Sequence, residues 1–292
     1  MATATEVARI RGRSWLERWV RFGVRATGIY VVLALMGITS LLPFFWMLSS
    51  SLKDRESLFE YPPQFIPAEP TLANYTFLFA QTNILRYTLN TAIVTVGVTA
   101  VVIILGSMAG YSFAKLEFPG RNFLFFGMLG GLMVPFEVLM IPLFILVVRM
   151  KLANTFPGII LPMAAGPFGI FVMRQYLLSI PDELLDAARV DGASEFTVFW
   201  RIVMPMSKPA VAALGTLIAI GAWNMFIWPL IVTSKEEMRV LTLAISILQL
   251  EYRGLYGTMM AAATVAFVPA LAIFLLFQRY FVQGIALSGL KG

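Results

Sequence analysis

Six long apolar runs, each free of lysine and arginine, constrain the fold of this 292-residue chain more than any other feature. Each run holds 22 to 28 residues, and about 20 apolar residues suffice for a helix to cross ~30 Å of hydrocarbon. Because hydrocarbon offers the backbone no hydrogen-bond partner, a spanning segment has to satisfy its own peptide groups as a helix. The sequence therefore predicts an all-α integral membrane protein. Its six transmembrane helices are expected at about residues 27–49, 88–113, 123–148, 156–178, 210–232 and 257–281.

The composition supports this class of protein and excludes several others. Hydrophobic residues make up 59% of the chain and charged residues 13%, whereas a soluble domain carries about 25% charged residues. The chain has no cysteine and no histidine. These absences exclude disulfides, thiolate nucleophiles, histidine acid–base catalysis and imidazole–metal sites. The strands of about ten alternating residues that mark a membrane barrel are missing. We expect no catalytic residue, no metal site and no enzyme.

Basic residues are distributed unevenly between the loops, and this predicts the orientation. The first 25 residues hold six arginines and only two glutamates. By the positive-inside rule the N-terminus is cytoplasmic, and an even number of spans places the C-terminus on the same side. That side then carries 14 of the 22 basic residues. The net charge of +6 is therefore a signal of topology and not of a nucleic-acid surface.

Residues 1–26 are expected to form a cytoplasmic amphipathic segment. Trp15, Trp19 and Phe22 lie among the arginines. This pattern is typical of a helix on the inner leaflet, with aromatic rings in the lipid and arginines near the lipid phosphates. A frayed tail is the alternative. The first apolar run is too long for a cleavable signal peptide, and no small-residue cleavage site follows it.

Two longer segments are expected outside the membrane. Residues 50–87 hold several prolines and then a short apolar stretch around Asn74, which predicts an extended loop followed by an interfacial helix. Residues 235–253 are expected to form a partly buried hairpin or helix. The first of these segments could bind a partner or could serve only as a packed lid.

The long cytoplasmic loop, residues 179–209, has the pattern of two short helices around a glycine corner. Ser179 and Asp182, with a proline between them, are typical of a helix start. Gly192 breaks this first helix, because glycine adopts the backbone conformation that a sharp reversal needs.

The second half of the loop predicts another amphipathic helix. Phe196 and Trp200 recur at helical spacing, and Pro205 and Pro209 are expected to end the helix and start the fifth span. A plain connector between two spans is the alternative interpretation. Against it stand five acidic residues on a surface that should be positive: Asp182, Glu183, Asp186, Asp191 and Glu195.

The loop resembles a known motif. The run from Glu183 to Ser194, Glu-Leu-Leu-Asp-Ala-Ala-Arg-Val-Asp-Gly-Ala-Ser, is similar to the EAA loop of binding-protein-dependent ABC importer permeases. Other runs resemble the carbohydrate-uptake subfamily, and most of all its MalG-type subunit: residues 135–144, 152–155, 223–230, 278–284 and 289–292. Two positions depart from the family pattern, because Asp186 replaces its first glutamate and Met204 replaces a leucine.

This resemblance implies the type I ABC importer permease fold in a bacterial or archaeal cytoplasmic membrane. In this family the loop lies in a groove of a cytoplasmic ATPase and transmits its closure to the spans, which alternate between two states. The residues that the resemblance assigns to ATPase coupling are Glu183, Asp186, Ala187, Ala188, Asp191, Gly192, Ala193, Phe196 and Pro205.

The resemblance also implies partners. They are a second permease subunit of the MalF type, a dimer of ABC ATPase subunits, an extracytoplasmic solute-binding protein, membrane lipid and a sugar substrate. The chain lacks the Gly-x-x-x-x-Gly-Lys-[Ser/Thr] phosphate loop, so ATP and Mg are expected on the partner ATPase and no cofactor on this chain.

The few polar groups inside the spans are candidates for the substrate pathway. The candidates are Glu137, together with the apolar Met133 near it, in the third span, and Trp223 and Asn224 in the fifth. Sugars present hydroxyl groups and apolar C–H faces, which suit amide, carboxylate and aromatic side chains. An intramembrane carboxylate is costly and usually faces a cavity or a partner.

Each of these residues has a structural alternative. Glu137 follows Pro135, which is expected to kink the helix, and its carboxylate could bond only a freed backbone group. Trp223 could be a packing residue or an interfacial anchor. Gly106 and Gly110, at Gly-x-x-x-Gly spacing in the second span, are expected to serve helix packing.

Two other functions remain open at this point. An ATP-independent secondary transporter would need paired intramembrane charges and an inverted repeat, but Glu137 is alone and no repeat is visible. A permease for a non-sugar solute, such as a glycerophosphodiester, would favour a basic residue in the spans, where there is none. The sequence does not name the sugar.

Overall fold

The computed structural model describes the backbone of residues 4–164 and 166–289, and the side chains of residues 27–163 and 166–278. Every regular element in these ranges is helical, which confirms the predicted all-α class. In chain order the elements are α1 (Ala4–Ser51), α2 (Ala73–Gln81), α3 (Ile84–Lys115), α4 (Arg121–Gly130), η1 (Gly131–Met133), α5 (Phe136–Arg149), α6 (Phe156–Ala164), α7 (Pro167–Leu177), α8 (Asp182–Val190), α9 (Glu195–Val198), the π-helix η2 (Phe199–Val203), α10 (Met204–Met206), α11 (Lys208–Trp223), α12 (Ile227–Val232), η3 (Glu236–Met238), α13 (Leu241–Glu251) and α14 (Tyr256–Gly289).

In the described part of the chain, three unbroken helices are long and apolar enough to cross a membrane. They are residues 27–51 of α1, all of α3, and residues 256–278 of α14. Three more candidates are bent pairs. The segment 121–133 meets α5 at 102°, α6 meets α7 at 49°, and the segment 195–206 meets α11 at 76°. The described residues therefore offer three spans, or up to six if each bent pair is one span.

The bend in the third expected span lies where the proline pattern placed it. Pro135 has an extended backbone, with φ −58° and ψ 138°, and α5 begins at the next residue. Proline lacks the N–H that an interior helical residue donates, so a helix ends or kinks there. Pro142 lies inside α5 without breaking it.

The fifth expected span, 210–232, contains a break that the sequence pattern did not indicate. Helix α11 ends at Trp223 and α12 begins at Ile227. The Asn224 side chain donates through Nδ2 to the Ile220 carbonyl oxygen at 2.8 Å. Asparagine competes with the helical backbone in this way and favours helix ends. Pro229 lies in the first turn of α12, where a missing N–H costs nothing.

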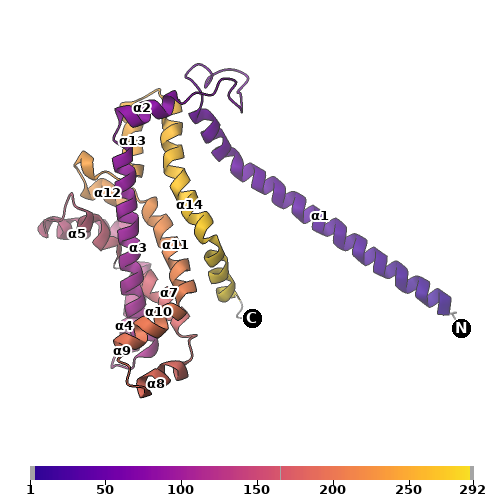
Figure 1. Ribbon diagram of the computed structural model, residues 1–292, viewed down its shortest axis with the longest axis vertical. Helices are drawn as coiled ribbons and strands as arrows, with labels where there is room; N and C mark the ends of the chain where they lie inside the picture. The colour runs from indigo at the N-terminus through magenta and orange to yellow at the C-terminus, as the bar shows by residue number, and fades with distance from the viewer. Residues whose placement is uncertain (1–3, 165, 290–292) are drawn as a thin grey trace.

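Helix α3 runs the length of the bundle and packs against α6, α7, α11 and α13 (Figure 1). Its glycines allow a close approach to α7. A Cβ atom on Gly106 would lie 3.0 Å from the backbone carbon of Gly169, and one on Gly110 would lie 2.8 Å from Cβ of Met173. The expected packing role of Gly106 and Gly110 is confirmed. The two backbones meet closely because neither glycine carries a side chain.

Helix α1 leaves the bundle (Figure 1). Residues 27–45 are exposed along its length. Near the end that joins the bundle, Phe44 stacks on Phe267 of α14 with ring centroids 4.5 Å apart. The aromatic and arginine side chains of the predicted amphipathic segment 1–26 lie outside the described residues.

The two segments expected outside the membrane are ordered against the bundle. Residues 52–72 form the expected loop, and α2 is the expected short helix after it. Asn74 Nδ2 donates to the carbonyl oxygens of Ser51 at 3.0 Å and Lys53 at 2.7 Å, which joins α2 to the end of α1. Within 235–253, α13 confirms the helix option.

Candidate functional site

The first helix of the long polar loop begins where the sequence indicated, but its N-cap residue is not the serine of the predicted helix start. Pro181 is the N-cap, with φ −60° and ψ 135°, and α8 starts at Asp182. Ser179 does not cap the helix, because its Oγ donates to the Tyr176 carbonyl oxygen at 2.6 Å. Asp182 and Glu183 lie in the first turn, where the helix dipole favours negative charge.

Gly192 forms the corner between the two loop helices. Its φ of +82° lies in the left-handed region, which glycine adopts without a steric penalty. The Gly192 N–H donates to the Arg189 carbonyl at 3.0 Å, and the Ala193 N–H donates to the Ala188 carbonyl at 3.0 Å. These two bonds are the Schellman pattern of a helix C-terminus. The predicted glycine corner is confirmed, and the backbone around it explains why the position needs glycine.

The second half of the loop forms the predicted second helical segment, residues 195–206, with a π-turn inside it. Ser194 caps α9 by accepting a hydrogen bond from the Thr197 N–H at 3.3 Å. The π-turn, η2, follows, and Pro205 then lies in the first turn of α10. The segment ends at Ser207, between Pro205 and Pro209, and α11 begins at Lys208, as the proline pattern predicted. Because proline has no N–H, the carbonyl of Arg201 lacks its usual donor, and a π-turn relieves this mismatch.

The loop is anchored by apolar residues on one side and exposes a mixed surface on the other. Leu185 and Val198 are completely buried, in a cluster that also includes Tyr111 of α3. Val190 is 88% exposed and Phe196 is 67% exposed. Of the other residues that the sequence assigned to coupling, Ala188 and Ala193 are half-buried. The rest are exposed: Glu183, Asp186, Ala187, Asp191, Gly192 and Pro205.

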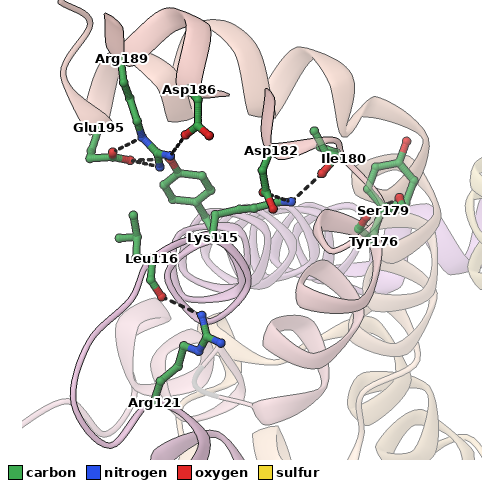
Figure 2. A network of polar contacts seen from close by, with 11 residues as sticks. Lys115, Leu116, Arg121, Tyr176, Ser179, Ile180, Asp182, Asp186, Arg189 and Glu195 are labelled. Atoms are coloured by element: carbon green, nitrogen blue, oxygen red, sulfur yellow. Dashed lines mark hydrogen bonds and ion pairs between the residues drawn. The ribbon is translucent and has the colours of Figure 1, made fainter. Parts of the chain in front are cut away.

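A polar network lies between the loop and the end of α3 (Figure 2). Arg189 donates to Asp186 Oδ1 at 2.8 Å and to Glu195 Oε1 at 2.7 Å. Glu195 Oε2 also accepts from the Tyr111 hydroxyl at 2.5 Å. Hydrogen bonds to Glu195 and Asp186 raise the pKa of Arg189 above its usual value. Asp186 thus already has a partner inside the loop, although its side chain is 64% exposed and only Oδ1 is bonded to Arg189.

A second connection joins the start of the loop to α3 (Figure 2). Lys115 Nζ donates to the Ile180 carbonyl at 2.5 Å and to Asp182 Oδ1 at 2.7 Å. The hydrogen bond from Lys115, with its charge, lowers the pKa of the Asp182 carboxyl. Sequence reasoning missed Tyr111, Lys115 and Arg189. The i,i+3 spacing of Asp186 and Arg189 indicated an ion pair. Tyr111 and Lys115 on α3 are remote from the loop in sequence, so no local pattern indicated their contacts with it.

The candidate pathway residues occupy three different environments. Met133 is 86% exposed, and Glu137 is exposed in the first turn of α5, so both flank the 102° bend. Asn224 is exposed at the break after α11. Trp223 is only 5% exposed, and its Nε1 donates to the Ala266 carbonyl of α14 at 2.9 Å. This placement matches the packing interpretation of Trp223.

The two helix breaks lie next to each other. The rings of Phe136, at the start of α5, and Trp228, in α12, meet edge to face with centroids 6.0 Å apart. Trp228 is 1% exposed and donates through Nε1 to the Gly158 carbonyl at 3.2 Å. The bend that carries Glu137 and the break that carries Asn224 are therefore joined by a buried aromatic contact.

A bundle of bent apolar helices with a structured polar loop is the architecture of a membrane protein with several spans. Residues 102–287 match the family model described as "Binding-protein-dependent transport system inner membrane component". The chain belongs to this family, and the expected type I ABC importer permease fold is confirmed. It is a transport subunit of the inner membrane, and a permease of this kind works with a partner permease, an ATPase and a solute-binding protein.

Two sugar permeases are similar to this chain over most of its length. The arabinooligosaccharides transport system permease protein AraQ of Bacillus subtilis (strain 168) is 36% identical over 275 residues, which are 93% of this chain and 98% of the relative. The lactose transport system permease protein LacG of Rhizobium radiobacter is 36% identical over 255 residues, 87% of this chain and 93% of the relative.

A solved structure shares the fold. It is the crystal structure of a bacterial ABC transporter involved in the import of the acidic polysaccharide alginate. The TM-score is 0.80 at 24% identity, and the match covers 88% of this chain and 97% of the other.

Proposed function

We propose that this chain is one of two permease subunits of an ATP-driven importer for a neutral sugar or oligosaccharide. The observation that carries the proposal is the loop 179–209, whose two short helices meet at a glycine in the left-handed conformation and present exposed acidic and apolar side chains. Similarity to sugar permeases supports the choice of substrate class. The same similarity makes a non-sugar solute and an ATP-independent transporter the less favoured alternatives.

The loop is proposed to dock on a dimer of ABC ATPase subunits, which bind ATP and Mg. Glu183 and Asp191 are exposed and suit a groove with basic residues. Val190 and Phe196 are highly exposed apolar residues on the same loop and suit burial in such a groove. Closure of the ATPase dimer would then move the loop and switch the spans between inward-open and outward-open states.

The proposed substrate pathway follows the two adjacent helix breaks. Met133 and Glu137 at the first break and Asn224 at the second supply an apolar, an acidic and an amide group. Non-helical backbone at membrane depth is tolerated where it lies in protein or lines a cavity. One chain would supply half of the pathway, and a MalF-type permease the other half. An extracytoplasmic solute-binding protein would deliver the sugar.

The transport experiment uses the complex that co-purifies with the tagged chain, reconstituted in vesicles with its solute-binding protein. We expect ATP-dependent accumulation of a neutral saccharide from a panel, and none of a glycerophosphodiester. Glu137→Gln should raise the KM for the saccharide about tenfold, because a hydrogen bond to a charged group is worth about 1.5 kcal/mol or more. Glu69→Gln, an exposed carboxyl in the loop 52–72, is the matched control and should leave KM unchanged.

Two results would contradict this proposal. Accumulation by the purified single chain without ATP would mean that no ATPase partner is needed. Uptake of the glycerophosphodiester in preference to every neutral saccharide would move the substrate to another class.

Both termini are proposed to lie in the cytoplasm, and labelling can test this because the native chain has no cysteine. Ile66→Cys, at a 73% exposed position, should react with a membrane-impermeant maleimide in intact cells. Ala4→Cys should react only after permeabilisation. Labelling of Ala4→Cys from outside would reverse the orientation.

A further inference from the structure

We propose that α3 receives the movement of the coupling loop through Tyr111 and Lys115, and carries it to the segment 235–239 at the opposite end of the bundle. The inference rests on the proposed coupling function of the loop. It adds two positioning residues, on a helix that is not adjacent to the loop in sequence, and assigns α3 the role of a rigid strut.

The first connection is a nearly buried ammonium group. The Lys115 side chain is 3% exposed. Its Nζ contacts both the Ile180 carbonyl, just before α8, and Asp182, the first residue of α8. The Asp182 side chain is 72% exposed, but Lys115 Nζ would lose both acceptors if α8 moved away, and a buried group left without its hydrogen bonds is destabilised. The start of α8 and the end of α3 are therefore expected to move together.

The second connection is a continuous chain of hydrogen bonds from the loop surface to the interior. It begins at Asp186, passes through Arg189 and Glu195, and ends at the hydroxyl of Tyr111, as Figure 2 shows for the labelled acidic residues and Arg189. Tyr111 is 4% exposed, and its ring lies 5.4 Å from that of Phe199. Both loop helices are thus fastened to one face of α3, on either side of the Gly192 corner.

The helices that flank the loop in sequence are less rigidly joined to it. At its far end, the loop meets α11 at a 76° bend at Ser207. At its near end, a non-helical turn separates α7 from α8. A bend or a turn can absorb a movement that a continuous helix passes on. The connection from the loop through α11 is therefore less rigid than the connection through α3.

Helix α3 is unbroken over 32 residues, which corresponds to about 48 Å. Its far end is fastened to the segment 235–239. The Tyr87 hydroxyl donates to Glu236 at 2.8 Å, and Asn90 Nδ2 donates to the carbonyls of Glu237 at 2.8 Å and Arg239 at 2.9 Å. One helix thus has polar contacts at both ends and close glycine packing against α7 between them. This arrangement suits a strut that links the two faces of the membrane.

The functional test compares Tyr111→Phe and Lys115→Met in the reconstituted complex with Tyr176→Phe. Tyr176 is the matched control, because its hydroxyl donates to the Met206 carbonyl at 3.1 Å and so joins the same loop to α7 instead of α3. Removing the α3 contacts should lower the number of sugars transported per ATP about tenfold, within the usual range of coupling energies. Bound ATPase and basal ATP hydrolysis should stay unchanged. The control should transport like the wild type.

The structural test measures distances between pairs of spin labels and leaves the contacts of α3 unchanged. One label is placed at Leu184 on α8, and the other at Val96 on α3 or at Leu217 on α11, all exposed positions. When the ATPase is trapped with nucleotide, the Leu184–Val96 distance should change by less than about 2 Å, the size of ordinary helix shifts, and the Leu184–Leu217 distance by more.

The outcomes distinguish a failure of this inference from a failure of the proposed function. If the wild-type complex couples ATP to transport but both α3 variants keep full coupling, the strut is refuted and the proposed function stands. The same holds if the Leu184–Val96 distance changes as much as the Leu184–Leu217 distance. If no ATPase associates with the wild-type chain, the proposed function fails and the strut fails with it.

Discussion

Replacing Gly192 by valine is expected to abolish transport while leaving the chain inserted in the membrane. The φ of Gly192 is +82°, and no heavy atom lies within 4 Å of the position that a Cβ atom would take. The penalty therefore comes from the backbone and not from crowding. A left-handed residue with a Cβ costs roughly 1–2 kcal/mol, and a β-branched one is a genuine outlier. The corner relaxes by opening, which rotates α8 against α9 and misplaces the docking surface.

The measurement is the initial rate of sugar uptake, normalised to the amount of chain in the membrane, together with ATPase stimulation. Gly192→Asn is the matched control, because asparagine tolerates the left-handed conformation and should keep most of the activity. Full stimulation in Gly192→Val would show that the loop is only a connector between spans. The coupling mechanism would then have to be withdrawn.

Replacing Gly158 by alanine should have the largest effect on stability. A Cβ atom there would lie 2.1 Å from the Leu152 carbonyl oxygen. That oxygen belongs to a tight turn in which Lys151 and Asn154 both have a φ of +58°. The turn is further tied by the Leu152 N–H, which donates to the Val147 carbonyl at 3.0 Å. Because a backbone atom cannot move aside cheaply, we expect a loss of about 3 kcal/mol, the upper end of overpacking costs.

The readout is the thermal midpoint of the purified complex in detergent. Gly127→Ala is the control, because no heavy atom lies within 4 Å of its added Cβ and alanine favours the helix by about 1 kcal/mol. It should be at least as stable as the wild type. Equal midpoints for the two variants would mean that the turn 150–155 adapts without strain.

The sequence carried the features that depend on local chemistry. The length of each apolar run predicts a helical membrane protein, because an unpaired peptide group is intolerable in hydrocarbon wherever it lies. Pro135 indicated a bend, because a missing N–H is a property of that residue alone. Gly192 indicated a corner for a similar reason, since only its own side chain decides whether φ can be positive. Each inference needed no knowledge of a second element.

The tertiary structure decided everything that depends on which distant groups meet. Glu195 pairs with Tyr111, a residue 84 positions away, and Asp182 with Lys115, 67 positions away. Trp223 faces α14 because Ala266 offers it a carbonyl oxygen there. Many acids and donors in the chain could pair equally well by chemistry, so composition cannot choose among them. The packing of α3 against α7 and the loop brings particular groups within reach, and this non-local geometry makes the choice.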